Sequence, residues 1–208
     1  MSLARLLQLA SPTLPVGAYS YSQGLESAIE AKIVFNSKTA EAWIADVLEL
    51  SVARMEAQVL RAQIAAPTQE LNDFFLATRE TAEMRAETLQ MGQALSRLLT
   101  DLAIPVPIEE PAFPTSFAIA VRHWSIEPRE AVIAYLWSWL ENQVMAAVKA
   151  VPLGQTDGQR MLLNLGGLIQ EISKRTLSIK DEDLGNFAPG LAMLSAGHET
   201  QYSRLFRS

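Results

Sequence analysis

The sequence of 208 residues contains no cysteine and only two histidines, His123 and His198. The absence of cysteine excludes disulfide bonds, thiolate nucleophiles and zinc sites with cysteine ligands. Two histidines are too few for a histidine-rich metal site within one chain. Lys and Arg number 17 against 23 Asp and Glu, so the net charge of −6 does not favour non-specific nucleic-acid binding. We therefore expect no metal site, no cofactor and no nucleic-acid partner.

Long apolar segments are also missing. Residues 6–25 carry no charge and match the length of a membrane span. They contain Pro12, Pro15 and Gly17, however, and cannot form a continuous apolar helix. The apolar stretch at residues 6–10 is too short for a signal peptide. The sequence therefore predicts a cytoplasmic protein without a membrane partner.

The sequence has no strand-like alternation of useful length, whereas apolar residues recur at steps of three and four. This spacing predicts helices over residues 38–64, 68–76, 84–102, 115–124, 127–148 and 158–179. Residues 104–114 contain four prolines and predict a loop. We expect an all-α, single-domain bundle of about seven to eight helices, with the helix over 127–148 at its centre. The apolar surface of residues 124–148 exceeds one buried stripe, which predicts a dimer interface.

Several charged residues fall at helical spacing and are expected to face solvent. Glu26 and Glu30 lie on one helix face. Residues 79–87 hold a mixed set in which Arg79 and Glu83 are one turn apart and could pair; its members are Arg79, Glu80, Glu83, Arg85 and Glu87.

No catalytic constellation stands out. His198-Glu199-Thr200-Gln201-Tyr202 begins like a zinc-protease motif, but position 202 is not the second histidine that this metal site needs. Residues 153–160 contain two glycines without the ending of a phosphate-binding loop. We predict no catalytic residue and no enzyme activity. A small hydrolase using His123 or His198 remains an alternative.

Two segments resemble helix starts. Thr156 with Gln159, and Ser20 with Gln23, have the spacing of a capping box. Around the first of them, polar side chains are more numerous than capping requires, so this region is either a structural junction or an interaction surface. The residues concerned are Lys149, Gln155, Asp157, Gln159 and Arg160.

The two ends of the chain differ from the middle. The first 25 residues are rich in Ser, Pro, Gly and Tyr, and the last 28 begin with Asp181-Glu182-Asp183 and close with an apolar and basic stretch. We divide the chain into an all-helical core at 1–180 and a C-terminal partner-binding tail at 181–208. The tail has too little apolar content to fold alone, so it either docks on its own domain or waits for a partner.

Three motifs carry a family resemblance. Residues 14–26 read Leu-Pro-Val-Gly-Ala-Tyr-Ser-Tyr-Ser-Gln-Gly-Leu-Glu, residues 149–159 read Lys-Ala-Val-Pro-Leu-Gly-Gln-Thr-Asp-Gly-Gln, and residues 198–206 read His-Glu-Thr-Gln-Tyr-Ser-Arg-Leu-Phe. In this order they resemble the urease accessory protein UreF family. The resemblance implies an all-helical, non-catalytic assembly chaperone that forms homodimers. It also implies binding to UreD (also called UreH), recruitment of the GTPase UreG, and nickel delivery into apo-urease.

The resemblance also implies the partner-binding residues. They fall in the three motifs and are Tyr19, Ser20, Ser22, Gly24, Glu26, Lys149, Gln155, Asp157, Gln159, Arg160, His198, Glu199, Tyr202, Ser203, Arg204 and Leu205. With no cysteine and two histidines the chain cannot hold nickel tightly, so we expect it to shape the metal's route rather than to store it. A GTPase regulator that supplies Arg204 or Arg160 in trans is an alternative function.

Overall fold

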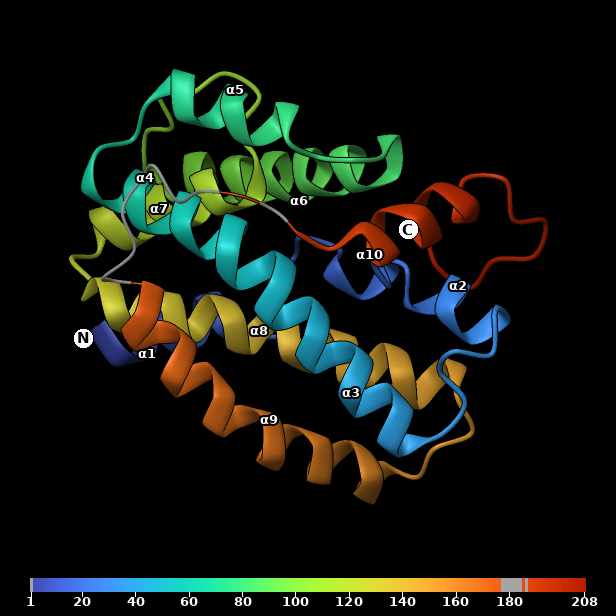
Figure 1. Ribbon diagram of the computed structural model, residues 1–208. Helices are drawn as coiled ribbons and strands as arrows, with labels where there is room; N and C mark the ends of the chain where they lie inside the picture. Colours follow the sequence, from blue (N-terminus) through green and yellow to red (C-terminus); the bar gives the residue numbers. More distant parts are fainter. Residues whose placement is uncertain (1, 177–184, 186) are drawn as a thin grey trace.

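The computed structural model describes residues 2–176, 185 and 187–208 (Figure 1). These residues form helices and no strand, so the predicted all-α class is confirmed. The predicted helix over 158–179 corresponds to α9 (Gln155–Thr176), and its last three residues lie outside the described part. The acidic run at 181–183 and residue 186 also lie outside it. No helix in the described part is long and apolar enough to cross a membrane.

Helix α8 (Pro128–Ala150) is the centre of the fold, as predicted. Its start is fixed by Glu127, whose side chain accepts a hydrogen bond from the Glu130 N–H at 3.0 Å, and by Pro128 in the first turn. It packs against α9, against α1 (Ser2–Ala10) and against the long helical rod described next (Figure 1). Trp139 and Tyr135, which widen its apolar surface, are buried within the chain itself. This surface therefore gives little support to the predicted dimer interface.

A long helical rod crosses α8 and consists of three parts, α3 (Ser37–Val47), the π-helical segment η2 (Leu48–Glu56) and α4 (Ala57–Ala65). Asn36 and Thr39 form a capping box at its start. The predicted helix over 38–64 is thus confirmed in extent, but its π-helical middle was not predicted. Each π-turn rotates the following side chains relative to an α-helix, and π-turns are often found at functional sites. Glu56, the last residue of η2, is buried.

Three further helices lie at the α4 end of the rod: α5 (Gln69–Ala77) and α7 (Phe113–His123) pack against α4, and α6 (Ala82–Asp101) packs against α7. Thr68 and Thr81 cap α5 and α6, because each side chain accepts a hydrogen bond from a first-turn N–H. Gly92 lets the loop before α7 approach α6 closely. A Cβ atom at this position would lie 2.0 Å from the Pro111 carbonyl oxygen, so only glycine fits.

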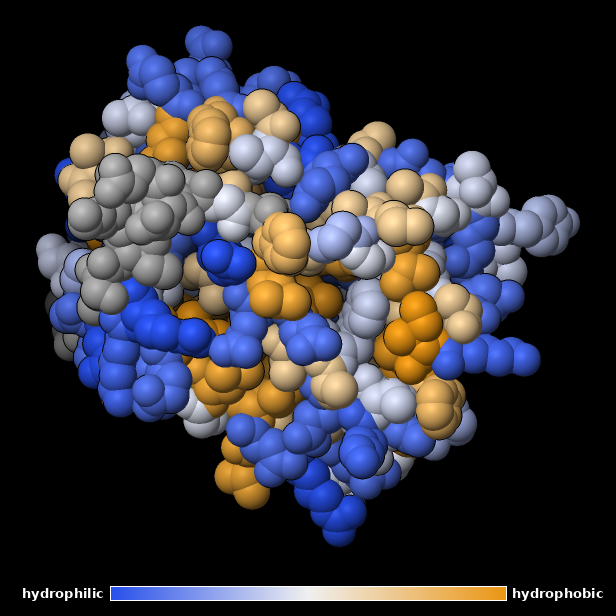
Figure 2. All heavy atoms as spheres, in the orientation of Figure 1, coloured by the Kyte–Doolittle hydropathy of each residue, from blue (hydrophilic) through white to orange (hydrophobic). Residues whose placement is uncertain are grey.

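The two ends of the chain meet beside the bundle. The short helix α2 (Leu25–Glu30) lies next to α10 (Pro189–His198), although the two are far apart in the sequence (Figure 1). The helix η1 (Ala18–Ser20) lies beside the last residues of the chain, where the Arg207 N–H donates to the Ser20 carbonyl oxygen. Gly24 makes this packing possible, because it has a φ of +77° and a Cβ there would lie 3.0 Å from Leu191 Cδ1. On the face seen in Figure 2, apolar side chains form separate patches bordered by polar ones.

Both predicted capping boxes are wrong. Ser20 lies inside η1, and it is the Ser22 hydroxyl that accepts a hydrogen bond from the Glu26 N–H at 3.3 Å. Thr156 lies inside α9, and it is Asp157 Oδ2 that accepts a hydrogen bond from the Gly154 N–H at 3.3 Å. In each case the helix begins one or more positions away from the predicted start, so a different side chain reaches the free N–H groups.

Candidate partner-binding site

Residues 187–208, here called the C-terminal segment, dock on the chain's own body. Its helix α10 is tied to the start of α6 by a hydrogen bond of 2.8 Å between the Ser195 and Thr81 hydroxyls. Its last residues run beside the N-terminal motif, where the Arg207 N–H donates to the Ser20 carbonyl oxygen at 2.8 Å. The sequence left open whether the tail docks on its own domain or waits for a partner, and the described part of the tail docks on its own domain.

Glu26 of α2 anchors this segment. Its carboxylate accepts hydrogen bonds from the main-chain N–H groups of Leu205 at 2.7 Å and Phe206 at 2.9 Å. Glu26 is buried, so the expectation that it faces solvent is wrong. The reason is that the C-terminal segment replaces the water that a surface carboxylate would otherwise bind.

His198, at the end of α10, lies between two carboxylates. Its Nε2 is 3.3 Å from Glu26 Oε2, and its Nδ1 is 2.7 Å from Glu83 Oε2. Arg204 donates to the other oxygen of Glu83 at 2.6 Å and to the Glu199 carbonyl oxygen at 2.8 Å. Glu83 was expected to face solvent and pair with Arg79. This expectation is wrong, because the C-terminal segment supplies its partners, His198 and Arg204.

Glu87 lies one turn after Glu83 on α6 and is only 5 % exposed. It accepts hydrogen bonds from Gln23 Nε2 at 2.7 Å and from the Ser208 hydroxyl at 2.8 Å. Burial raises the pKa of the Glu87 carboxyl from 4.5 to about 7, against the lowering effect of these two hydrogen bonds. We call Glu26, Glu83 and Glu87 the acidic seat of the C-terminal segment.

A second buried network lies next to the acidic seat. Arg79 Nη1 donates to Glu56 Oε1 at 3.2 Å, and the Tyr135 hydroxyl donates to Glu56 Oε2 at 2.6 Å. Burial, together with the negative charge of Glu56, raises the pKa of Tyr135 well above 10. The predicted solvent-facing position is therefore wrong for Arg79, whereas Glu80 and Arg85 are exposed as expected.

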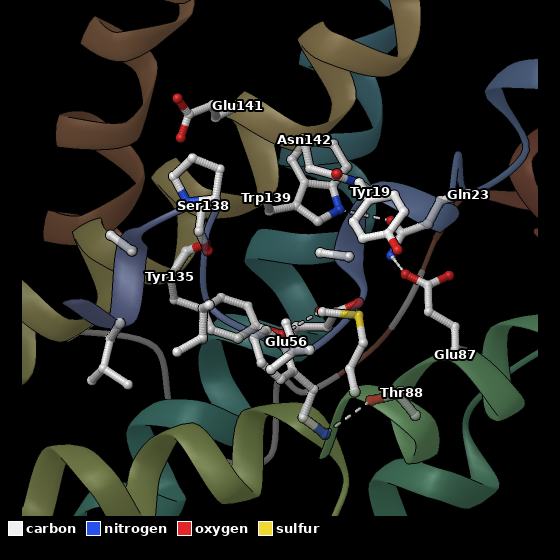
Figure 3. A pocket seen from close by; sticks show the side chains of 18 of the residues that line it. Tyr19, Gln23, Glu56, Glu87, Thr88, Tyr135, Ser138, Trp139, Glu141 and Asn142 are labelled. Carbon is white, nitrogen blue, oxygen red and sulfur yellow. Dashed lines mark hydrogen bonds between the residues drawn. The ribbon is translucent and has the colours of Figure 1, made fainter. Parts of the chain in front are cut away.

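A cavity of about 280 Å³ connects the two networks (Figure 3). Trp139 lines it and donates its indole N–H to Gln23 Oε1 at 2.7 Å, so Gln23 joins the cavity wall to Glu87. Tyr19 lies at the cavity with a largely exposed side chain. The remaining walls are mainly apolar and include Leu9, Leu14, Val16, Met84, Met91 and Phe113. Such a chamber can bind or admit small solutes, but it offers no activated nucleophile.

The structure brings together most of the residues predicted from the first and third motifs. Ser22 binds the Ser208 main-chain oxygen, and Glu26 contacts His198 and Leu205. From the second motif, Lys149 lies 4.9 Å from the centre of the Phe206 ring. The other members of that motif lie at the start of α9 and, within the described ranges, make no hydrogen bond to the C-terminal segment: Gln155, Asp157, Gln159 and Arg160.

The sequence reasoning missed several residues of this site, namely Gln23, Glu83, Glu87 and Ser208. One signal was available for Glu87, because Met84, Thr88 and Met91 recur at steps of four and three on the same helix and Glu87 borders this apolar stripe. The spacing of apolar residues within one helix does not identify the segment that packs over a carboxylate at the edge of its apolar stripe. A segment more than 100 residues away in sequence covers it here.

Neither histidine forms a catalytic pair in the described part of the chain. His123 is exposed at the end of α7, and His198 faces two carboxylates without a hydroxyl partner. A hydrolase of the predicted kind needs a nucleophile within hydrogen-bond reach of its base. The described residues also contain no group of three or more histidine and acidic side chains placed to hold a metal ion.

Comparison with known proteins gives the family. The UreF family model matches residues 34–166. The chain belongs to the UreF family. A urease accessory protein UreF of Azoarcus sp. (strain BH72) is 51 % identical over all of this chain and 96 % of its own length. Relatives with the same name from Dechloromonas aromatica (strain RCB) and Methylobacillus flagellatus are 50 % and 46 % identical, each over all of this chain and 98 % of its own length. The UreF resemblance of the three motifs is thus confirmed along the whole sequence.

Proposed function

We propose that this UreF-family chain is a non-catalytic assembly chaperone for urease, acting in the cytoplasm. It dimerises, binds UreD (UreH), recruits the GTPase UreG and helps to deliver nickel into apo-urease. The full-length similarity to proteins named urease accessory protein UreF supports this role. The buried acidic seat supports it as well, because it uses charged residues to position a surface rather than to activate a substrate.

The observation that carries the docking proposal is the arrangement of the last residues. His198 and Phe206 are buried and hold the segment in place, whereas the side chains of Tyr202 and Leu205 point outward and are exposed. Leu205 is 59 % exposed although its N–H is bound to Glu26. Tyrosine is among the residues enriched at binding hot spots, and an exposed leucine beside it adds apolar surface that a partner can bury.

Capture of UreD by the isolated chain tests this proposal. We expect the double variant Tyr202→Ala/Leu205→Ala to keep its helical content and thermal stability, because neither side chain is buried. Capture of tagged UreD should weaken by about tenfold or more, as expected for loss of hot-spot residues. Leu163→Ala is the matched control, because Leu163 is equally apolar and 81 % exposed on α9, away from the C-terminal segment.

The outcomes are distinct. Undiminished capture by the double variant contradicts the placement of the UreD surface on the C-terminal segment. Equal loss in the Leu163→Ala control indicates a non-specific effect of surface hydrophobicity and also contradicts it. Sedimentation velocity over a concentration series tests the dimer separately, and a monomer at every concentration would argue against it.

Nickel is the cargo in this proposal and is not held by the chain. Imidazole and thiolate are the ligands that bind nickel well. His198 already has a carboxylate at each ring nitrogen, and cysteine is absent. We expect the chain alone to bind Ni²⁺ only weakly in equilibrium dialysis. Micromolar or tighter binding by the monomer would contradict this part of the proposal.

The GTPase-regulator alternative now points to Arg160 rather than Arg204. The Arg204 guanidinium is bound by Glu83, Gln201 and Glu199. Arg160 has a single ion pair with Asp157, and its side chain is 71 % exposed. Arg160→Ala should slow GTP turnover by UreG without weakening complex formation if an arginine acts in trans. Unchanged GTP turnover would contradict the regulator alternative and would be consistent with the docking role.

A further inference from the structure

A second pocket, of about 340 Å³, also has Tyr19 in its wall. Its walls come from three parts of the chain, namely residues 15–21 of the first motif, residues 90–97 of α6, and Arg207 of the C-terminal segment. Its lining is mainly polar, whereas the cavity of Figure 3 is mainly apolar. Because Arg207 forms one wall, the pocket is complete only when the C-terminal segment is docked.

This pocket is basic although the chain is acidic. It contains two guanidinium groups, those of Arg97 and Arg207, and no Asp or Glu side chain lines it. In the sequence as a whole, acidic residues outnumber basic ones by 23 to 17. Within the described ranges neither of the two arginines forms an ion pair. Two positive charges on one pocket without a counter-charge favour the binding of an anion.

Arg207 is held in position by neutral groups. Its main-chain N–H donates to the Ser20 carbonyl oxygen at 2.8 Å, and its Nη1 donates to Gln90 Oε1 at 3.3 Å. The same Gln90 oxygen accepts a hydrogen bond from the Tyr21 hydroxyl at 2.7 Å. Burial and the charge of Glu87 raise the pKa of Tyr21, and the Arg207 guanidinium beside it opposes them. These contacts orient the guanidinium without neutralising its charge.

We propose that this pocket is a phosphate-binding site, in which Arg97 and Arg207 bind one phosphate group and so hold the C-terminal segment against α6. A phosphate group carries about −1.5 to −2 charge at neutral pH, which matches two arginines. Guanidinium groups bind its oxygens in bidentate pairs. The hydroxyls of Tyr19 and Ser20 line the same pocket and form no hydrogen bond with the described part of the chain, so they can donate to the remaining oxygens.

Phosphate binding and docking of the C-terminal segment are coupled in this proposal. Arg97 belongs to α6 and Arg207 belongs to the segment, so release of the segment removes one of the two charges from the pocket. A ligand that binds only the docked state stabilises that state by mass action. The phosphate can be a free ion or part of a nucleotide, and these two sources are separated by experiment.

Titration of the isolated chain with inorganic phosphate, followed by NMR, tests the site without any partner, so its result is independent of the proposed function. With the ionic strength held constant by sodium chloride, we expect saturable shifts of the Nε–Hε signals of Arg97 and Arg207. A parallel titration uses AMP. Tighter binding of AMP than of phosphate assigns the site to a nucleotide, and the reverse order assigns it to the free ion.

Hydrogen exchange of the Arg207 N–H measures the coupling, because this group donates to Ser20 only when the segment is docked. At a phosphate concentration ten times the dissociation constant, we expect its protection to rise by about tenfold. Sodium chloride at the same ionic strength should not give this rise.

The variant Arg97→Gln should weaken phosphate binding by about tenfold or more, because it removes one charge-assisted pair. Arg85→Gln is the matched control and should bind like the wild-type chain. Arg85 is also an exposed arginine of α6, but it does not line the pocket. Neither arginine takes part in a hydrogen bond with the described residues, so we expect both variants to fold.

Three results would overturn the proposal. If neither phosphate nor AMP gives saturable shifts, the pocket is not a phosphate site. If Arg97→Gln weakens binding no more than Arg85→Gln does, the pocket does not supply the binding groups. If phosphate binds but leaves the protection of the Arg207 N–H unchanged, the site does not hold the C-terminal segment.

Discussion

The substitution Glu87→Gln tests the energetic role of the acidic seat. Glu87 is almost fully buried, with Gln23 and Ser208 as its hydrogen-bond donors. A glutamine has the same shape and no charge. Its amide oxygen can accept from Gln23, and its amide N–H can donate to the Ser208 hydroxyl, which rotates to suit. The variant therefore keeps both hydrogen bonds and removes only the titration.

The sign and size of the effect follow from the pKa of Glu87, which is raised from 4.5 to about 7 in the folded protein. The folded state binds this proton more tightly than the unfolded state does. The stabilising contribution is fully present below about pH 4.5 and is lost as the pH rises to about 7. Across that interval the free energy of unfolding of the wild-type chain falls by about 3 kcal/mol from this group.

Equilibrium urea denaturation at a series of pH values measures this effect. We expect the wild-type and Glu87→Gln chains to have similar stability near pH 5 and to separate as the pH rises, with the variant more stable by up to about 3 kcal/mol near pH 8. Taking the difference between the two chains removes the pH dependence that all other groups contribute. Glu30→Gln is the control, because Glu30 is exposed on α2.

The reasoning is refuted if the difference in free energy of unfolding between the two chains does not change with pH. It is also refuted if Glu30→Gln shows the same change. A variant whose stability deficit relative to the wild-type chain grew as the pH rose would mean that the carboxylate is needed in its charged form.

Three other substitutions test further contacts of the fold, the first two by urea denaturation and the third by hydrogen exchange. Gly92→Ala should destabilise the chain by about 3 kcal/mol, because its Cβ would meet the Pro111 carbonyl oxygen, whereas Gly167→Ala, with nothing within 4 Å, should be neutral or slightly stabilising. Tyr135→Phe should cost about 1 to 3 kcal/mol, since it removes a donor from buried Glu56, and Tyr202→Phe on the surface should cost nothing measurable. Lys149→Met should weaken the docking of the C-terminal segment by about 0.5 to 1 kcal/mol, read from the exchange of the Phe206 N–H, because it removes the cation over the Phe206 ring.

Apolar periodicity was sufficient to predict most of the fold. The spacing within α8 predicted both its extent and its central position, because a helix with apolar residues on more than one face must be surrounded by others. The π-helical turn at residues 48–56 was not predicted, since its pattern of apolar residues also fits an α-helix. Capping was misassigned at Ser20 and Thr156, because α2 begins at Leu25 and α9 begins at Gln155, which changed the side chains that could cap.

Charge positions were the least predictable feature. Arg79, Glu83 and Glu87 have the spacing of a solvated helix face, and each is instead covered by a distant part of the chain. The local sequence indicates which face of a helix a residue lies on, but it does not indicate which segment packs over that face. The motif residues Glu26 and His198 were selected by family resemblance, and the structure shows a contact between them that neither motif alone implies.

The most direct test of the docking role is copurification of the wild-type chain with tagged UreD and UreG, followed by mass measurement of the eluted species. The account predicts a stable complex that contains all three proteins. It also predicts that neither histidine of this chain contributes an enzymatic activity. A chain that elutes alone, or that turns over a substrate in isolation and loses this activity on replacement of His123 or His198, would contradict it.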